Sequence, residues 1–270
     1  MLKDITLGQY FPGDTIAHRL DPRTKILLVV LYIVALFCAN SLLAYGILAL
    51  VLAVCVRVSH VGLKSLVRGL KPVVFIIVFT GVLNLFFTPG DHTLVEWGVL
   101  RITETGARNA LFMVLRIMLL IMGTFLMTYT TSPISLTDGL ERLLNWMKKL
   151  HVPVHELAMI MSIALRFIPT LIEETDKIMN AQKARGAQLD TGKMLDRVKA
   201  LVPVLIPLFI SAFRRADELA MAMECRCYRG GDGRTRLKVL RCTKQDYIDL
   251  AFCIVCFAVI LSSRWVFPNF

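Results

Sequence analysis

The 270-residue chain is too apolar for an ordinary soluble domain, because 56% of its residues are hydrophobic and only 19% are charged. Its mean hydropathy of +0.63 indicates a polytopic membrane protein. A net charge of +11 would suit nucleic-acid binding, but the basic residues lie between apolar runs, as in the cytoplasmic loops of membrane proteins. We therefore expect a lipid bilayer, and no nucleic acid, as a partner.

The first helix start is predicted at the run Asp21-Pro22-Arg23-Thr24-Lys25, where an acidic cap precedes a proline at the first helical position. Residues 26–56 are then almost wholly apolar. As one helix they would be about 46 Å long, which exceeds a hydrocarbon core of roughly 30 Å. Because Asn40-Ser41 interrupts the run, we expect two short spans that turn there.

Two further spans are predicted before residue 132. The connection 57–71 carries four Lys or Arg residues and no acid, so the positive-inside bias places it in the cytoplasm. Residues 72–88 predict a third span, and a turn at Pro89-Gly90-Asp91 leads into a loop that we expect outside. Residues 110–131 predict a fourth span, which returns the chain to the cytoplasm.

Arg116 lies well inside the fourth predicted span, where a charge is costly and usually faces protein or water. We interpret it as a helix-packing arginine that bonds to Asn84 or to backbone carbonyls. It is not expected to be a transport residue.

Residues 132–246 differ in character, with 19 Lys or Arg and 13 Asp or Glu among short apolar pieces. Leucines at helical spacing predict an amphipathic helix over 135–150. A second helix is predicted over 154–174, bent at Pro169 and continuing to Arg185, and a third from Met194 to Arg226. We expect these helices to lie flat at the cytoplasmic face, with their apolar sides against the membrane or another subunit.

The last predicted span covers residues 248–263. By parity, the N-terminus is expected inside and the C-terminus outside. The predicted organisation is therefore an N-terminal segment with four spans (1–131), a cytoplasmic coupling domain (132–246) and a C-terminal span (247–270).

One arginine motif occurs twice, 41 positions apart, as Ala184-Arg185-Gly186 and Cys225-Arg226-Cys227. In both approaches an aspartate stands nine residues before the arginine, an aliphatic residue seven before and an alanine four before. Positions seven, four and zero fall on one face of a helix, so each copy predicts a narrow face that ends in one guanidinium. That shape suits insertion into a groove on a partner.

Motifs for catalysis, metals or cofactors are not expected. The segment from Gly186 to Gly192-Lys193 has the wrong spacing for a phosphate loop, and Met194 stands where Ser or Thr would hold magnesium. His151 and His155 are separated by a helix-breaking Val-Pro, and Cys253 with Cys256 lies inside an apolar helix, where packing explains the spacing. We therefore expect no enzyme activity, no metal and no cofactor.

Taken together, several motifs resemble the transmembrane coupling subunit, or T component, of energy-coupling-factor (ECF) transporters, the ABC-type importers of vitamins and metal ions. The motifs run along essentially the whole chain: Asp21-Pro22-Arg23-Thr24-Lys25, Thr131-Ser132-Pro133, Leu140-Glu141-Arg142-Leu143-Leu144, Leu165-Arg166-Phe167-Ile168-Pro169, Ala181-Gln182-Lys183-Ala184-Arg185-Gly186 and Phe213-Arg214-Arg215-Ala216 to Arg226. One departure is Cys-Arg-Cys at 225–227, where Ala-Arg-Gly is the commoner form. The resemblance implies an all-α integral membrane protein with about five transmembrane helices and a cytoplasmic domain of long, crossed amphipathic helices.

The resemblance also implies a non-catalytic role in the plasma membrane of a prokaryote, with the N-terminus and the coupling domain in the cytoplasm. Two cytosolic ABC ATPases, which the unequal motifs favour as non-identical, would each receive one arginine helix end. A separate substrate-binding membrane protein, the S component, would contact apolar side chains of the coupling helices and import a vitamin or another micronutrient. The residues expected to face the S component are Met159, Ile163, Leu205, Phe209 and Phe213.

Two other function classes remain as alternatives. A membrane-embedded enzyme would need a paired acid and base, which the sequence does not offer. A self-contained secondary transporter would be built from inverted repeats with polar residues at the membrane midplane. Here the duplicated feature lies in the expected cytoplasmic part instead.

Overall fold

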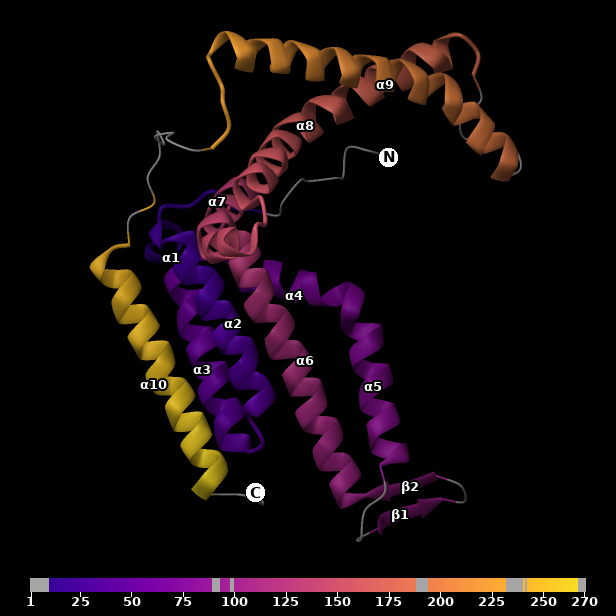
Figure 1. The fold of residues 1–270 in the computed structure, drawn as a ribbon. Coiled ribbons are helices and arrows are strands. Elements are labelled where there is room, and N and C mark those ends of the chain that lie inside the picture. Colours follow the sequence, from indigo (N-terminus) through magenta and orange to yellow (C-terminus); the bar gives the residue numbers. More distant parts are fainter. Residues whose placement is uncertain are drawn as a thin grey trace. The chain divides into compact units, whose positions relative to one another are not determined.

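The computed structural model describes residues 10–88, 93–97, 100–187, 194–231, 240 and 242–266, and most of them are helical (Figure 1). Packing divides the chain into two compact units. Unit 1 contains residues 1–7 and 143–238, and unit 2 contains residues 8–142 and 239–270. The ranges predicted from the sequence, 1–131, 132–246 and 247–270, separate the membrane spans from the cytoplasmic domain. They do not describe packing units, and they stay predictions.

Unit 2 holds most of the apolar helices. Its helices and strands are α1 (Ile16–Arg19), α2 (Pro22–Cys38), α3 (Leu42–Ser59), α4 (Leu63–Leu70), a 3-10 turn (Lys71–Val73), α5 (Val74–Phe87), β1 (Thr93–Trp97), β2 (Leu100–Thr103), α6 (Glu104–Thr130), α7 (Pro133–Leu143) and α10 (Lys244–Val266). The all-α membrane class predicted from the sequence is confirmed. One short antiparallel hairpin of β1 and β2, within the described residues, lies where only a loop was expected.

Short polar side chains fix where the helices of unit 2 begin. The carboxylate of Asp21 accepts a hydrogen bond from the backbone N–H of Arg23 at 3.0 Å and thereby caps α2. Ser41 caps α3 through a bond from Ala44 N–H at 3.2 Å. The predicted helix start at Asp21 and the predicted turn at Asn40-Ser41 are both confirmed.

Asp246 joins the two ends of unit 2. Its buried carboxylate accepts the backbone N–H of Asp21 at 2.9 Å, and the N–H and hydroxyl of Thr243 at 2.6 and 2.7 Å. Cys242 lies beside this site, with its Sγ 3.7 Å from Asp21 Oδ2. Partial burial and the nearby carboxylates raise the pKa of the Cys242 thiol. α10 is thus tied to the start of α2.

Five helical stretches of the described chain are long and apolar enough to cross a membrane: Leu42–Ser59, Leu63–Phe87, Glu104–Thr130, Val154–Ala184 and Lys244–Ser262. The expected number is confirmed, but the set differs. α2 has 17 residues, one fewer than the shortest of these stretches, whereas the stretch Val154–Ala184 (α8) of unit 1 was expected in the cytoplasm. The cytoplasmic position of α8 stays a prediction.

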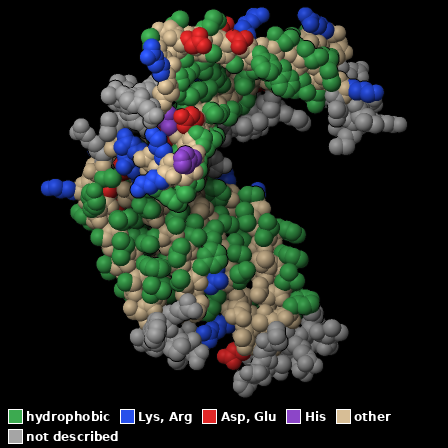
Figure 2. Space-filling model, viewed as in Figure 1, with side chains coloured by type: hydrophobic (Ala, Val, Ile, Leu, Met, Phe, Trp, Pro, Cys, Tyr) green, Lys and Arg blue, Asp and Glu red, His purple; other side chains and the backbone are tan. Residues whose placement is uncertain are grey.

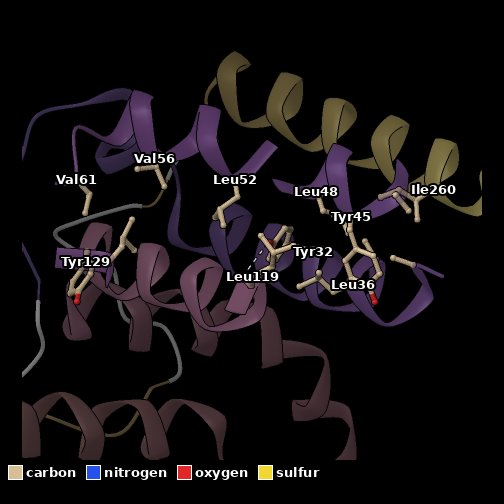
Figure 3. Close-up of a cluster of buried hydrophobic side chains, with 14 residues drawn as sticks. Tyr32, Leu36, Tyr45, Leu48, Leu52, Val56, Val61, Leu119, Tyr129 and Ile260 are labelled. Atoms are coloured by element: carbon tan, nitrogen blue, oxygen red, sulfur yellow. Dashed lines mark hydrogen bonds between the residues drawn. The ribbon is translucent and has the colours of Figure 1, made fainter. Parts of the chain in front are cut away.

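The core of unit 2 lies between α2, α3, α6 and α10 (Figure 3). Leu36 is fully buried in it, and the hydroxyl of Tyr32 donates to the carbonyl of Leu119 at 3.2 Å. Gly123 lets α6 approach α2 closely, because a Cβ there would lie 2.5 Å from Cε1 of Tyr32. A small residue at a contact between apolar helices is typical of membrane proteins, where close packing replaces the hydrophobic effect.

Arg116 packs inside unit 2 as the sequence predicted. Its Nη2 donates to the carbonyl of Ala39 at 3.2 Å, and its Nε donates to the hydroxyl of Tyr45 at 3.0 Å. The bond to a backbone carbonyl is therefore confirmed, but Asn84 is not the side-chain partner, since its amide donates to Thr80 within α5. Arg116 instead satisfies the carboxyl end of α2.

Unit 1 contains a 3-10 helix (Leu144–Leu150), α8 (Val154–Ala184) and α9 (Met194–Cys225). The predicted helix over 135–150 was wrong beyond Leu143, where the chain tightens into the 3-10 helix and ends at His151, a left-handed residue with φ of 61°. The two long predicted helices are confirmed within a residue or two, with Pro169 inside α8 and with Pro203 and Pro207 inside α9.

Candidate partner-binding helix ends

α8 and α9 pack against each other as an antiparallel, crossed pair within unit 1 (Figure 1). Near the end of α8, the amide of Gln182 donates to the carbonyl of Pro203 at 3.4 Å. Further back, Glu174 of α8 meets Ser211 and Arg215 of α9. The C-terminal half of α8 therefore lies beside the middle of α9, from Pro203 to Arg215.

The contact at Glu174 is the strongest polar link between the two helices among the described residues. One carboxylate oxygen accepts a short hydrogen bond from the Ser211 hydroxyl, and the other accepts Arg215 Nη2 at 2.8 Å. The carboxylate side chain is 25% exposed and the guanidinium side chain 34%. A charge-assisted pair at this depth fixes the two helices against each other at one point of their crossing, although no large apolar core lies between them.

α8 ends on its arginine motif in a Schellman arrangement, in which Arg185 is the cap residue. The N–H of Gly186 donates to Lys183 at 3.0 Å, and the N–H of Ala187 donates to Gln182 at 3.0 Å. Gly186 has φ of 86°, a left-handed conformation that glycine adopts without steric cost. Ala184, Arg185 and Gly186 are all exposed.

α9 ends in the same arrangement, with Arg226 as the cap residue. The N–H of Cys227 donates to Glu224 at 2.8 Å, and the N–H of Tyr228 donates to Met223 at 3.0 Å. Cys227 takes the left-handed position with φ of 55°, which a residue with a Cβ adopts only at some cost. Cys225, Arg226 and Cys227 are exposed. The sequence duplication is thus also a duplication of backbone structure.

The two arginines lie at opposite ends of the helix pair. Arg226 lines a groove with Met159 of α8, whereas Arg185 follows the last residue of α8. Met159 and Arg185 are 26 positions apart, which corresponds to roughly 40 Å along a helix. One compact partner site does not reach both ends, so the geometry suits two separate binding events.

The surroundings of the two arginines differ. Arg226 opens onto a groove of about 600 Å³, whose lining includes Arg166, Tyr228 and Arg229. At the other end, a Cβ on Gly186 would have no atom within 4 Å. One arginine therefore borders a basic groove and the other stands at an open helix tip.

The residues expected to face the S component fall into two groups. Leu205, Phe209 and Phe213 of α9 are 44%, 61% and 69% exposed. Met159 and Ile163 of α8 are half-buried and line the groove beside Arg226. Contact of all five with a partner stays a prediction.

Further exposed apolar side chains extend the same faces, and the sequence interpretation missed them. Figure 2 shows hydrophobic side chains spread over the visible surface of the protein. The additional exposed residues of α8 and α9 include Leu157, Ile160, Met161, Val202, Ile206 and Ile210. These residues are one, three or four positions apart, as on one face of a helix. This spacing could have predicted them, because it continues the stripe of the residues already expected to face the S component.

Groups that could do chemistry are sparse. No cluster of three or more His, Cys, Asp or Glu suited to a metal occurs within the described ranges. Gly192-Lys193, considered above as a phosphate-loop element, lies outside the described residues.

Comparison with known proteins gives consistent matches over nearly the whole chain. Residues 13–237 match the family model CbiQ, described as cobalt transport protein. A protein of Clostridium kluyveri is 53% identical over 268 residues, which cover 98% of this chain and 99% of that protein. Proteins of Ruminiclostridium cellulolyticum and Bacillus subtilis are 50% and 46% identical, over 99% and 98% of this chain and 100% of each relative. All three carry the name energy-coupling factor transporter transmembrane protein EcfT.

Proposed function

The chain belongs to the family of energy-coupling factor transporter transmembrane proteins, and we propose that it couples two cytosolic ABC ATPases to a separate substrate-binding membrane protein. As a transmembrane component of an ECF transporter it takes part in transport across a membrane. The finer assignment concerns what each unit contacts.

The duplicated helix ends are the observation that carries the proposal. Each end presents one exposed arginine at the cap of a long helix, and the two lie at opposite ends of the α8–α9 pair. A guanidinium held at a capped tip offers a planar fork of donors that matches a carboxylate. We assign Arg185 and Arg226, with their small neighbours, to two ATPase grooves lined by acidic side chains.

The crossing of α8 and α9 suits mechanical transmission. When ATP draws the two ATPases together, the seated tips move with them, and the angle between the helices changes about their contact. The Glu174, Ser211 and Arg215 cluster lies at that contact and would act as the pivot. The chain itself supplies no step of ATP hydrolysis in this scheme.

The exposed apolar stripe of α9 is assigned to the S component. Leu205, Phe209 and Phe213 are large and exposed, and such a surface calls for a cover of protein or lipid. Motion of the helix pair would then loosen or reorient the substrate-binding protein. In this assignment unit 1 and the N-terminus lie on the cytoplasmic side of a prokaryotic plasma membrane.

Charge reversal at the two tips tests the assignment. Arg185→Glu and Arg226→Glu should each lower co-purification of the ATPases by at least about tenfold, because each places like charges together in a groove. The double variant should lose the ATPases while the chain remains in the membrane fraction.

The matched control is Arg214→Glu, an equally exposed arginine on the side of α9. It should leave the yield of the complex unchanged. A double variant that retains its ATPases at the wild-type level would overturn the proposal.

A further inference from the structure

Unit 2 contains a polar groove of about 590 Å³ beside the first three turns of α6. Two arginines, three asparagines and one glutamate contribute to its lining: Arg108, Arg116, Asn40, Asn84, Asn109 and Glu104. In a chain this apolar, a polar groove between membrane helices needs a polar occupant, because polar groups facing hydrocarbon are costly.

The groove opens where the α2–α3 hairpin ends. α2 and α3 have 17 and 18 residues, roughly 26 Å each, which is shorter than a hydrocarbon core of roughly 30 Å. Asn40 of their turn lines the groove, and Arg116 bonds to Ala39 at the same level. From Arg116, α6 extends 12 residues back to its first residue, Glu104, and this part of α6 reaches beyond the α2–α3 turn (Figure 1). A bilayer centred on this hairpin would place the groove at the depth at which lipid headgroups meet the acyl chains.

Stacked rings hold the two arginines along one wall. The Arg108 guanidinium lies 5.6 Å from the centre of the Phe112 ring, and Phe112 stacks on Tyr45 at 5.3 Å. The Arg116 guanidinium lies 6.0 Å from the Tyr45 ring. These cation–π contacts order both guanidiniums.

Both arginines keep donors for a ligand. Arg116 uses Nε and one Nη2 bond, which leaves three of the five N–H donors of a guanidinium. Among the described residues no carboxylate pairs with Arg108 or Arg116. Glu104 is the one acid of the lining, so two cations face one anion. The groove is basic and suits an oxyanion with several acceptors.

Exposed apolar side chains stand within three residues of the lining residues Asn84 and Phe112 along α5 and α6. Leu83 and Phe87 of α5 and Leu111 of α6 are 38%, 76% and 52% exposed. A ligand that carries both a phosphate and hydrocarbon chains would satisfy the groove and this surface together, whereas a free phosphate would satisfy only the groove.

We propose that this groove binds the phosphate of an anionic phospholipid, with Arg108 at its mouth, Arg116 at its base and the asparagine amides as further donors. The site is independent of the ATPase-binding tips of unit 1. It anchors the short α2–α3 hairpin and α6 to the headgroup layer.

Native mass spectrometry of the purified full chain tests the proposal, with phosphatidylglycerol, phosphatidylcholine of the same acyl chains, and inorganic phosphate as probes. Phosphatidylglycerol should bind more tightly than phosphatidylcholine. Arg108→Gln should lower the affinity for phosphatidylglycerol about fivefold, since one interfacial cation contributes on that order. Arg108 makes no hydrogen bond within the described residues, so its loss should leave the fold intact.

Two further variants separate binding from folding and from general charge. Arg116→Lys keeps a donor for Ala39 and should also lower the affinity for phosphatidylglycerol, because the planar fork is lost. Arg68→Gln removes an exposed arginine from α4, outside the groove, and should have no effect.

Three results would overturn the lipid assignment: equal affinity for the two lipids, an equal effect of Arg68→Gln and Arg108→Gln, or full displacement of phosphatidylglycerol by inorganic phosphate at matched concentration. The last would identify the occupant as a free anion.

Discussion

Both units of the protein contain long helices with apolar faces, but the two units are stabilised in different ways. In unit 2, a cluster that includes Tyr32, Leu36, Leu48 and Ile260 is buried between four helices. In the described part of unit 1, Val154 and Val204 are the buried apolar side chains. Unit 2 therefore carries its own core, whereas unit 1 presents apolar faces that other molecules must cover.

The same difference bears on α8, whose cytoplasmic position is a prediction from the sequence. Its length and composition would allow it to cross a membrane, yet its most apolar window is 0% buried inside the protein. Glu156, Arg166 and Glu174 interrupt its apolar surface. Charged residues at such intervals suit a helix that contacts partners along one side and water along the other.

The largest effect is expected from a substitution that disturbs the packing of unit 2. Gly123→Val should destabilise the unit by about 2 to 3 kcal/mol, because its Cβ alone would lie 2.5 Å from the Tyr32 ring. Thermal unfolding in detergent should show a lower midpoint.

Gly46→Val is the matched control, since it makes the same change within a helix of the same unit. A Cβ at Gly46 would meet no atom within 4 Å, so its effect should stay within about 0.5 kcal/mol. Equal midpoints for the two variants would mean that α2 and α6 do not depend on this close approach.

A smaller effect is expected at the crossing of unit 1. Glu174→Gln removes the charge that pairs with Arg215 and should weaken the α8–α9 contact by about 1 kcal/mol, a figure kept low by solvent screening at this partly exposed site. Spin labels on α8 and α9 should then report a broader distance distribution.

Glu173→Gln removes the same charge one residue away, at an exposed position, and should leave that distribution unchanged. A distribution that stays narrow in Glu174→Gln would show that the crossing is fixed by apolar contacts instead.

Much of this fold could be predicted from the sequence because local chemistry decides it. Asp21-Pro22 and Asn40-Ser41 have strong intrinsic preferences, and both set helix ends where expected. The arginine motifs were also readable, since their spacing repeats at helical positions. Their shared backbone arrangement follows from the same repetition.

The remaining features depend on contacts between distant residues. The groove at Arg116 combines side chains from α5, α6 and the α2–α3 turn, and no local pattern brings Asn40 and Asn109 together. Likewise, Met159 and Phe209 share an apolar pattern, but only the pairing of α8 with α9 turns Met159 toward Arg226. The 3-10 helix after Leu143 replaced a predicted α-helix although its leucine spacing was favourable.

The most local effect concerns the two helix ends, where one sequence difference falls on the same backbone position. Gly186 and Cys227 are both left-handed, but only glycine adopts that conformation without strain. Cys227→Gly should therefore stabilise the end of α9 by about 1 kcal/mol, and Gly186→Cys should destabilise the end of α8 by a similar amount. Because the sites lie roughly 40 Å apart, the two changes in stability should add independently. The variant that carries both substitutions should therefore be about as stable as the wild type.

Hydrogen exchange of the Tyr228 and Ala187 amides measures these effects directly, since each amide donates the bond that closes its helix end. Exchange at Tyr228 should slow about fivefold in Cys227→Gly, and exchange at Ala187 should quicken about as much in Gly186→Cys. Cys225→Gly provides the contrast, because the same change at the last helical residue of α9 should speed exchange at Tyr228. Faster exchange at Tyr228 in Cys227→Gly would mean instead that the Cys227 thiol itself stabilises this end.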